Sequence, residues 1–217
     1  LAARNMVALD EAQQWIEAES PGARTSLVAL DLTSLAGVRT AAAAIAELAP
    51  SIDVLMNNAG VMFTPFARTA DGFENQFGTN HLGHFELTRL LRPQLTGARI
   101  VILSSDGHHM SDVDLDDPNW ERREYDKFAA YGASKTANIL HMVELNRRYA
   151  DAGVHAVAVH PGVVGTSLAR HMTRDDFGAL RSMAADNRDK GAVLDSLLTP
   201  EQGATTQVWA ATAPELD

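Results

Sequence analysis

The chain has 217 residues, of which 46% are hydrophobic and 21% are charged, and this length suits one globular domain with its own core. The absence of cysteine excludes a disulfide scaffold, a thiolate metal site and a cysteine nucleophile. The formal net charge of −10 disfavours nucleic acid and anionic membranes as main partners, and no apolar run reaches the roughly 20 residues of a membrane span. We therefore expect a single domain over 1–217 that lies in the cytoplasm.

Short apolar runs of strand length alternate with longer segments in which apolar residues recur at helical spacing. In chain order they predict a helix over 7–19, a strand over 26–30, a helix over 35–48, a strand over 52–56, a helix over 71–95, a strand over 100–103, a helix over 127–150, a strand over 154–159 and a helix from Pro200. Loops are predicted over 65–69 and over 106–126, which is polar and lacks a regular period, and no helix or strand is assigned over 166–197. Because the strands are continuously apolar, we expect a doubly wound α/β fold with a parallel sheet. Ligands bind such folds at the carboxyl ends of the strands.

Tyr131 and Lys135 lie four residues apart at the start of the helix predicted over 127–150, so their side chains share one helical face. An ammonium there can lower the pKa of the phenol and let it exchange a proton near neutral pH. This arrangement would make the tyrosine a general acid/base. An incidental pair on a surface helix explains the spacing equally well.

Polar residues at the strand ends and one asparagine in a helical pattern are further candidates. Ser105 follows Ser104 at the end of a strand, where its hydroxyl can donate to a substrate oxygen, although serines in such places more often cap turns. The small residues of 58–60 let a ligand approach the backbone, and an ordinary tight turn explains them nearly as well. Asn80 is unfavourable inside a helix, so it either bends the helix or faces solvent.

The histidines suggest no metal site. His81 and His84 are three residues apart, and His108 and His109 are adjacent, but no carboxylate completes a recognised ligand spacing. We therefore interpret them as solvated side chains and expect no metal. The sequence also lacks a Gly-x-Ser-x-Gly elbow and a P-loop, which removes the usual hydrolase and nucleotide-hydrolysing classes.

Taken together, the segment 57–60, Asn80, Ser105, Tyr131-Gly132-Ala133-Ser134-Lys135 and Pro161-Gly162 resemble the short-chain dehydrogenase/reductase family in order and position. The stretches 71–85 and 119–122 resemble its retinol-dehydrogenase-like branch, and the resemblance covers nearly the whole chain. It implies a Rossmann-like domain that binds a dinucleotide and carries out catalysis.

The resemblance also implies roles for individual residues. Tyr131 would be the general acid/base, Lys135 would lower its pKa and hold the nicotinamide ribose, Ser105 would orient and polarise the reacting oxygen, and Asn80 would support a proton relay. The remaining residues implied to bind the cofactor are Asp31 and Leu32 at the adenine, Asn58, Ala59 and Gly60 along the nucleotide, and Pro161, Gly162, Val164 and Thr166 at the carboxamide.

One departure from the family concerns the first strand and its glycine-rich phosphate loop, which have no counterpart here. Leu1 to Arg4 resembles the end of the family's second strand, so we expect the domain to be incomplete at both ends. Arg4 would then lie where an arginine pairs with the 2′-phosphate of NADP. This favours NADP over NAD.

The expected function is that of an NADP-dependent oxidoreductase that interconverts an alcohol and a ketone or aldehyde. The alternatives are a non-catalytic nucleotide-binding sensor or interaction module on the same fold, and a light-dependent or double-bond reductase. The segment 166–197 would form a lid, and helices 71–95 and 127–150 could support a homodimer. An apolar substrate is suggested by the lid residues Leu168, Met172, Phe177, Leu180 and Met183.

Overall fold

Parallel strands with helices on both sides form the centre of the molecule, as predicted. The computed structural model describes residues 1–185 and 197–216. Within these residues, β1 (Ala2–Ala3) pairs with β2 (Val28–Ala29), and a second sheet has the order β3 (Val54–Asn57), β4 (Arg99–Leu103) and β5 (His155–Val159). Every pairing between named strands is parallel. The predicted single sheet is thus divided into a two-stranded and a three-stranded part within the described residues.

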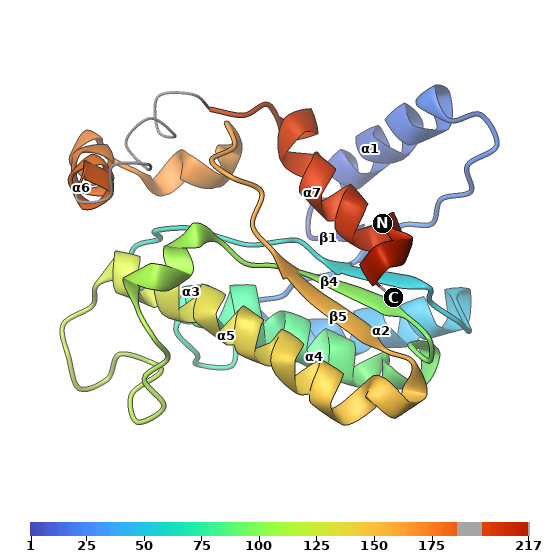
Figure 1. Ribbon diagram of the computed structural model, residues 1–217, viewed down its shortest axis with the longest axis horizontal. Coiled ribbons are helices and arrows are strands. Elements are labelled where there is room, and N and C mark those ends of the chain that lie inside the picture. Colours follow the sequence, from blue (N-terminus) through green and yellow to red (C-terminus); the bar gives the residue numbers. More distant parts are fainter. Residues whose placement is uncertain (186–196, 217) are drawn as a thin grey trace.

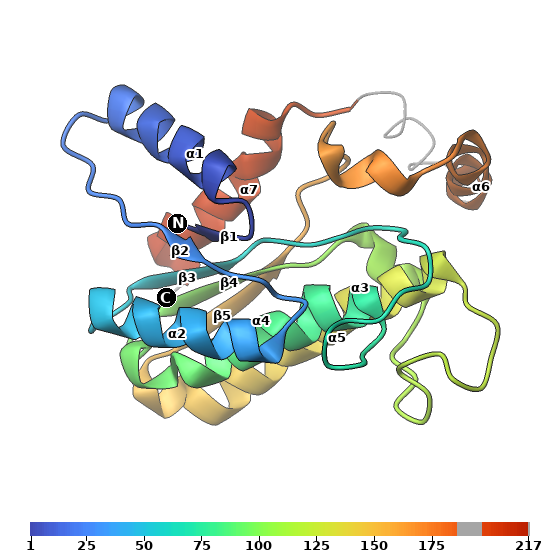
Figure 2. The same cartoon turned by 180° about the vertical axis from the view of Figure 1, so that it is seen from behind.

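The helices lie in two layers (Figures 1 and 2). One layer holds α1 (Met6–Glu19) and α7 (Pro200–Thr212), and the other holds α2 (Leu35–Leu48), α4 (Gly83–Leu90) and α5 (Lys127–Tyr149). Polar side chains begin several of these helices by accepting hydrogen bonds from free backbone N–H groups. The capping side chains are those of Asn5 for α1, Ser34 for α2, Asp126 for α5 and Thr199 for α7.

The continuous helix predicted over 71–95 was wrong. In its place are the short helix α3 (Asn75–Phe77), a π-helical turn over Gly78–Leu82, α4 and a 3₁₀ turn over Arg92–Gln94. The first helix starts late because the chain reverses at Gly72, where φ is +87°. After this turn the backbones of Arg68 and Glu74 pair in an isolated antiparallel bridge. Glycine adopts such a left-handed conformation without steric cost.

Several strand boundaries also differ from the prediction. The strand expected over 26–30 is limited to β2, whose partner β1 has only two residues, and the strand expected over 52–56 is shifted to β3. The loop expected over 106–126 begins with a 3₁₀ helix, Asp106–Met110. A short apolar run locates a strand but does not show where its hydrogen-bonding partner ends.

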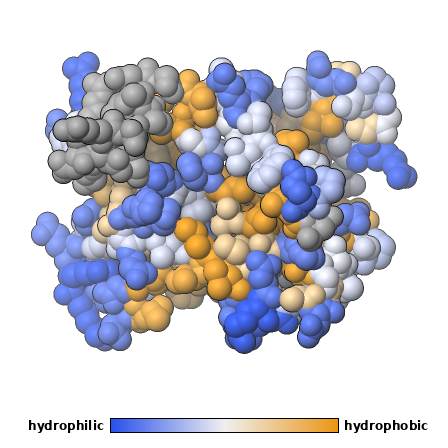
Figure 3. Space-filling model, viewed as in Figure 1, coloured by the Kyte–Doolittle hydropathy of each residue, from blue (hydrophilic) through white to orange (hydrophobic). Residues whose placement is uncertain are grey.

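The main core lies between the strands and the layer of α2, α4 and α5. Its fully buried members include Val38, Leu91 and Ile100. A smaller cluster packs β4 and β5 against α7. On β3, Val54 and Met56 are each 40% exposed, so this strand is not covered on both faces as its composition suggested. Figure 3 shows hydrophobic residues gathered across the middle of one face, between the two helical layers.

No helix within 1–185 and 197–216 combines the length and the apolar character that crossing a membrane requires. The longest is α5, whose 23 residues include lysine, arginine and glutamate.

Candidate active site

Five of the predicted site residues meet where β3, β4 and the start of α5 converge. Tyr131 and Ser105 meet at Gly107, because a Cβ atom there would stand 2.8 Å from Tyr131 Cε1 and 3.3 Å from Ser105 Oγ. Gly60 lies against Asn80 and Lys135, because a Cβ atom at Gly60 would stand 3.0 Å from Asn80 Oδ1 and 3.7 Å from Lys135 Nζ. The fold therefore brings together residues that are up to 75 positions apart, as the parallel topology predicts.

The Tyr131 phenol is enclosed by protein. The residue is only 4% exposed, and this burial raises the pKa of the phenol, while the hydrogen bond with Ser105 acts in the opposite direction. The sequence predicted a net lowering by Lys135, and the direction found here is the reverse. Lys135 Nζ lies 5.6 Å from the centroid of the Tyr131 ring, and desolvation of the phenolate is the largest cause of the shift.

Lys135 is a buried cation on the same helix. It is 3% exposed, and burial lowers its pKa from 10.5 to about 8. Its Nζ donates to the Leu103 carbonyl oxygen at 3.0 Å, and Asn138 Nδ2 donates to the same oxygen at 3.0 Å. An ammonium has three donors, so Lys135 retains hydrogen-bonding capacity beyond Leu103 for a ligand at the strand ends.

Ser105 has the capping role that its position suggested. Its Oγ accepts a hydrogen bond from Gly107 N at 3.0 Å, which caps the 3₁₀ helix after β4. This cap holds the hydroxyl at Gly107, against which the Tyr131 ring also packs. Donation from Ser105 to a substrate oxygen stays a prediction.

Gly107 is a point of close packing against this pair. A Cβ atom there would lie 2.8 Å from Tyr131 Cε1 and 3.3 Å from Ser105 Oγ. We expect Gly107→Ala to destabilise the fold by about 1–3 kcal/mol and to lower turnover, because overpacking displaces the phenol. Thermal unfolding and steady-state kinetics check this. Gly178→Ala is the matched control, since a Cβ atom at Gly178 meets nothing within 4 Å, and equal losses in both variants would contradict the explanation.

Asn80 is fully buried in the π-helical turn, so it does not face solvent. Its Oδ1 accepts from Val61 N at 2.7 Å, and its Nδ2 donates to Val61 O at 2.9 Å and to Ser134 Oγ at 3.0 Å. Ser134 Oγ in turn donates to the Tyr131 carbonyl oxygen at 2.7 Å. Asn80 thus ties the segment after β3 to α5, while its part in a proton relay stays a prediction.

The interpretation of His81 and His84 as solvated was wrong. His84 is buried, and its Nδ1 lies 2.9 Å from the Asn80 carbonyl oxygen, while the His81 ring packs 5.8 Å from that of His141. Burial lowers the pKa of each of these three histidines to about 4, so they are neutral at physiological pH. Among the described residues no group of three or more histidine or carboxylate side chains is placed to hold a metal ion.

The residues predicted at the adenine end lie on and beside the β1–β2 sheet. Arg4 is exposed directly after β1. Asp31 Oδ1 accepts from the backbone N–H and the hydroxyl of Thr33, so it closes its own turn. Leu32 is buried, and its backbone approaches Gly83 so closely that a Cβ atom there would lie 2.6 Å from the Leu32 carbonyl oxygen. Asn58 and Ala59 are exposed at the end of β3.

The segment predicted to hold the carboxamide follows β5. Pro161 is partly buried, Gly162 has a φ of +80°, and Val164 pairs with Leu198 in an isolated parallel bridge. Thr166 Oγ1 accepts from Leu168 N at 3.3 Å, which begins a 3₁₀ helix over Ser167–His171. This segment is therefore held by local caps and by the residues that precede α7.

The predicted lid includes α6 (Arg174–Ala185). Lys127 Nζ at the start of α5 pairs with Asp176 at 2.7 Å, and this ion pair joins α6 to the helix that carries Tyr131. Phe177 is half exposed. The rest of the lid, 186–196, and the side chain of Met183 lie outside the described residues.

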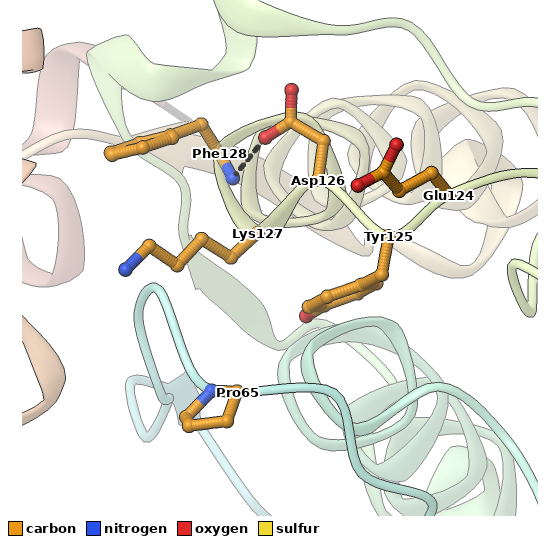
Figure 4. Close-up of a pocket in the computed structure, with 6 residues that line it drawn as sticks. All are labelled: Pro65, Glu124, Tyr125, Asp126, Lys127 and Phe128. Atoms are coloured by element: carbon orange, nitrogen blue, oxygen red, sulfur yellow. Dashed lines mark hydrogen bonds between the residues drawn. The ribbon is translucent and has the colours of Figure 1, made fainter.

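A pocket of about 580 Å³ adjoins the first turn of α5. Figure 4 shows Pro65 on a loop across from Tyr125 and Lys127, and the Asp126 carboxylate accepts from Phe128 N at 2.8 Å. Lys127 precedes Tyr131 by four residues, so the pocket lies about one helical turn from the phenol along α5.

Sequence reasoning missed several residues that support the site. Ser134 and Asn138 each lie three residues after a predicted site residue, so helical spacing was a usable signal for them. Glu74 and Gln76 are fully buried polar side chains, and their contacts reach segments about 50 residues away. Local periodicity contains no sign of such contacts.

Comparison with known proteins agrees with this arrangement. The family model for short chain dehydrogenases matches residues 1–176. Human retinol dehydrogenase 13 is 40% identical over 220 residues, which cover 100% of this chain and 65% of that protein. The short-chain dehydrogenase/reductase prx1 of Penicillium roqueforti is 40% identical over 213 residues, covering 94% of this chain and 59% of the relative. The chain thus spans less than two thirds of the length of these relatives.

Solved structures show the same fold. An uncharacterized protein from Mycobacterium paratuberculosis is 42% identical, with a TM-score of 0.66 over 85% of this chain and 65% of that one. RhlG of Pseudomonas aeruginosa, solved as a complex with NADP, has a TM-score of 0.68 over 98% of this chain and 78% of that one, and at 23% identity it supports the fold alone. On the family match and these relatives, the chain belongs to the short-chain dehydrogenase/reductase family, in which it is similar to the retinol dehydrogenases.

Proposed function

We propose that the chain carries the catalytic centre of an NADP-dependent oxidoreductase that interconverts an alcohol and a ketone or aldehyde. The observation that carries this proposal is the grouping of Tyr131, Ser105 and Lys135. A buried phenol and a serine hydroxyl lie together at Gly107, and a buried ammonium lies 5.6 Å from the ring centroid. These groups are suited to moving a proton to or from an oxygen atom at the strand ends.

The residues at this site fit a nicotinamide nucleotide. Lys135 has donors beyond the one used on Leu103, which suits ribose hydroxyl groups. Gly60 has no side chain at the point where Asn80 and Lys135 approach, so these two side chains come close to the backbone after β3. A nicotinamide nucleotide, when bound, supplies or accepts the hydride.

The side chains would divide the remaining work as follows. In the direction of reduction, the Ser105 hydroxyl orients the carbonyl oxygen by donating to it, and the Tyr131 phenol gives that oxygen its proton. The positive charge of Lys135 stabilises the resulting phenolate. Asn80 holds the segment after β3 and the first turns of α5 in register. In the direction of oxidation Tyr131 takes the proton back.

The preference for NADP rests on Arg4, whose guanidinium is suited to pair with a 2′-phosphate. Structural neighbours do not decide between NADP and NAD, because RhlG was solved with NADP and a short-chain dehydrogenase/reductase from Burkholderia phymatum was solved with NAD. We expect NADPH to bind about tenfold more tightly than NADH, and Arg4→Ala to remove most of that difference. Titration of the protein with each nucleotide, followed by nucleotide fluorescence, measures both affinities.

Arg24→Ala is the control for this titration, because Arg24 is another arginine of the same region. Equal affinities for the two nucleotides, or an Arg4→Ala variant that keeps the difference, would contradict the NADP preference. If neither nucleotide binds, the oxidoreductase proposal fails for this chain. The competing sensor function predicts nucleotide binding without turnover of any alcohol or carbonyl compound, and an enone substrate separates the double-bond reductase alternative.

An apolar alcohol or carbonyl compound is the proposed substrate, because apolar residues such as Leu168 and Phe177 occur in the lid segment. A homodimer through α4 and α5 is also proposed, since Phe85, Leu140 and Val143 expose apolar surface on these helices. Sedimentation at increasing concentration measures the oligomeric state. The cytoplasmic location stays a prediction.

A further inference from the structure

The backbone of Phe63 is left-handed although the residue is not glycine. Its φ is +51°, and it is only 2% exposed. Bulky residues rarely adopt this conformation, and it persists only where the surroundings impose it. Phe63 lies just beyond β3, and its ring centroid is 4.6 Å from that of Phe128 and 5.0 Å from that of Tyr131. The contact with Tyr131 is edge-on, with 69° between the ring planes.

The Gln76 side chain contacts the backbone at this left-handed residue. It is fully buried, and its Oε1 accepts from Phe63 N at 2.8 Å. Its Nε2 donates to the Tyr125 hydroxyl and to the Lys127 carbonyl oxygen, both at 2.9 Å. One amide therefore joins the segment after β3 to the first residue of α5, the helix on which Tyr131 lies one turn later.

The orientation of this amide is fixed by Glu74, which is also fully buried. Glu74 Oε1 accepts from Gln76 N at 2.8 Å and from the Tyr125 hydroxyl at 2.9 Å. Because the Tyr125 proton goes to Glu74, its oxygen is free to accept from Gln76 Nε2. The Gln76 nitrogen must then face Tyr125 and Lys127, which leaves its oxygen for Phe63.

The Tyr131 ring is confined by its neighbours. Gly107 leaves no room for a Cβ atom beside Cε1, and the edge-on Phe63 ring makes a second contact. An aromatic pair in this geometry has a preferred orientation. Phe63 therefore influences the orientation of the Tyr131 ring as well as the exposure of its hydroxyl to water.

We propose that Gln76 is a positioning residue for Tyr131, holding Phe63 in its left-handed conformation so that the Phe63 ring braces the phenol beside Ser105. The role rests on the proposed function, in which Tyr131 moves the proton. Its test reads the phenol directly and needs no turnover, so the failure of one proposal is distinguishable from the failure of the other.

The experiment uses tyrosine labelled at the hydroxyl-bearing ring carbon, observed by NMR across a pH titration. The chain has three tyrosines, Tyr125, Tyr131 and Tyr149, and the signal of Tyr131 is assigned with Tyr131→Phe. We expect Gln76→Met and Phe63→Leu each to shift this signal and to lower the phenol pKa by about one unit, because water then reaches the hydroxyl.

The double variant tests whether Gln76 acts through Phe63. If it does, Gln76→Met with Phe63→Leu shifts the Tyr131 signal no further than Phe63→Leu alone. Val38→Ala is the control for lost stability, because Val38 is fully buried in the core at α2. It should lower the unfolding temperature and leave the Tyr131 titration unchanged.

Two results would overturn the proposal. A folded Phe63→Leu protein with an unchanged Tyr131 signal and titration would show that the ring does not brace the phenol, whether or not Gln76→Met folds. Additive shifts in the double variant would show that Gln76 acts by another route. A shift in Val38→Ala as large as those of the test variants would reduce the effect to general loosening, and would likewise overturn it.

Discussion

Tyr131→Phe is expected to lower kcat by about 1,000-fold while changing nucleotide affinity by less than about twofold. Phenylalanine keeps the ring and its edge-on contact with Phe63, so the packing survives and only the hydroxyl group is lost. Steady-state kinetics with a carbonyl substrate and a fluorescence titration with NADPH measure the two quantities. The loss should appear in kcat and kcat/KM alike, because a proton transferred in the transition state does not contribute to binding.

Tyr149→Phe provides the matched control for this change. Tyr149 ends α5, and its ring lies 4.3 Å from the Arg92 guanidinium, a contact that phenylalanine also makes. This control should keep its activity within about twofold. A Tyr131→Phe enzyme that retains more than about a tenth of its turnover would remove Tyr131 from the role of proton donor.

Lys135→Met is expected to abolish most turnover and yet to stabilise the fold, raising the free energy of unfolding at pH 7 by about 1–3 kcal/mol. Burial lowers the pKa of Lys135 from 10.5 to about 8. Keeping the charged ammonium out of water therefore destabilises the folded state relative to the unfolded chain. Methionine fills a similar volume without charge. The hydrogen bond to the Leu103 carbonyl oxygen is lost, but Asn138 still donates to that oxygen.

The stabilisation expected from Lys135→Met depends on pH through the protonation of Lys135 in the folded and unfolded states. Between pH 8 and 10.5 the unfolded chain holds the Lys135 proton and the folded chain has released it, so stability from this group rises with pH across that window. Below pH 8 the cost is present in full, and above pH 10.5 it vanishes. The advantage of Lys135→Met over the unmodified protein should therefore be largest at pH 7 and should shrink by pH 10.

Urea unfolding at both pH values measures this advantage. Lys127→Met is the control, because Lys127 pairs with Asp176 at 2.7 Å and is partly exposed, so its loss should not stabilise the protein. A Lys135→Met variant that is less stable than the unmodified protein at pH 7 would show that the buried ammonium is fully compensated by its contacts.

The architecture could be predicted because it depends on local patterns. Apolar runs of strand length and apolar residues at helical spacing located most strands and helices to within a few residues. The grouping of Tyr131 and Lys135 also followed from the sequence, because two residues four positions apart on a helix lie on the same face.

The environment of these groups could not be predicted in the same way. The sequence suggested that Lys135 lowers the Tyr131 pKa, but the amount of water excluded from the phenol depends on Phe63 and Gly107, which reach it from other segments. Burial raises that pKa, and no local pattern reports burial of this kind.

The sequence by itself thus determined the parallel α/β order and the place of Tyr131 and Lys135 on one face of one helix, because each depends on neighbours within a few residues. Only the tertiary structure decided the break in the helix over 71–95, the burial of His84 and the orientation of Asn80. Asn80 bonds to Ser134, 54 residues away, and such a contact forms only after both segments have folded. Hydrogen bonds between distant segments are set by packing, which residue spacing does not encode.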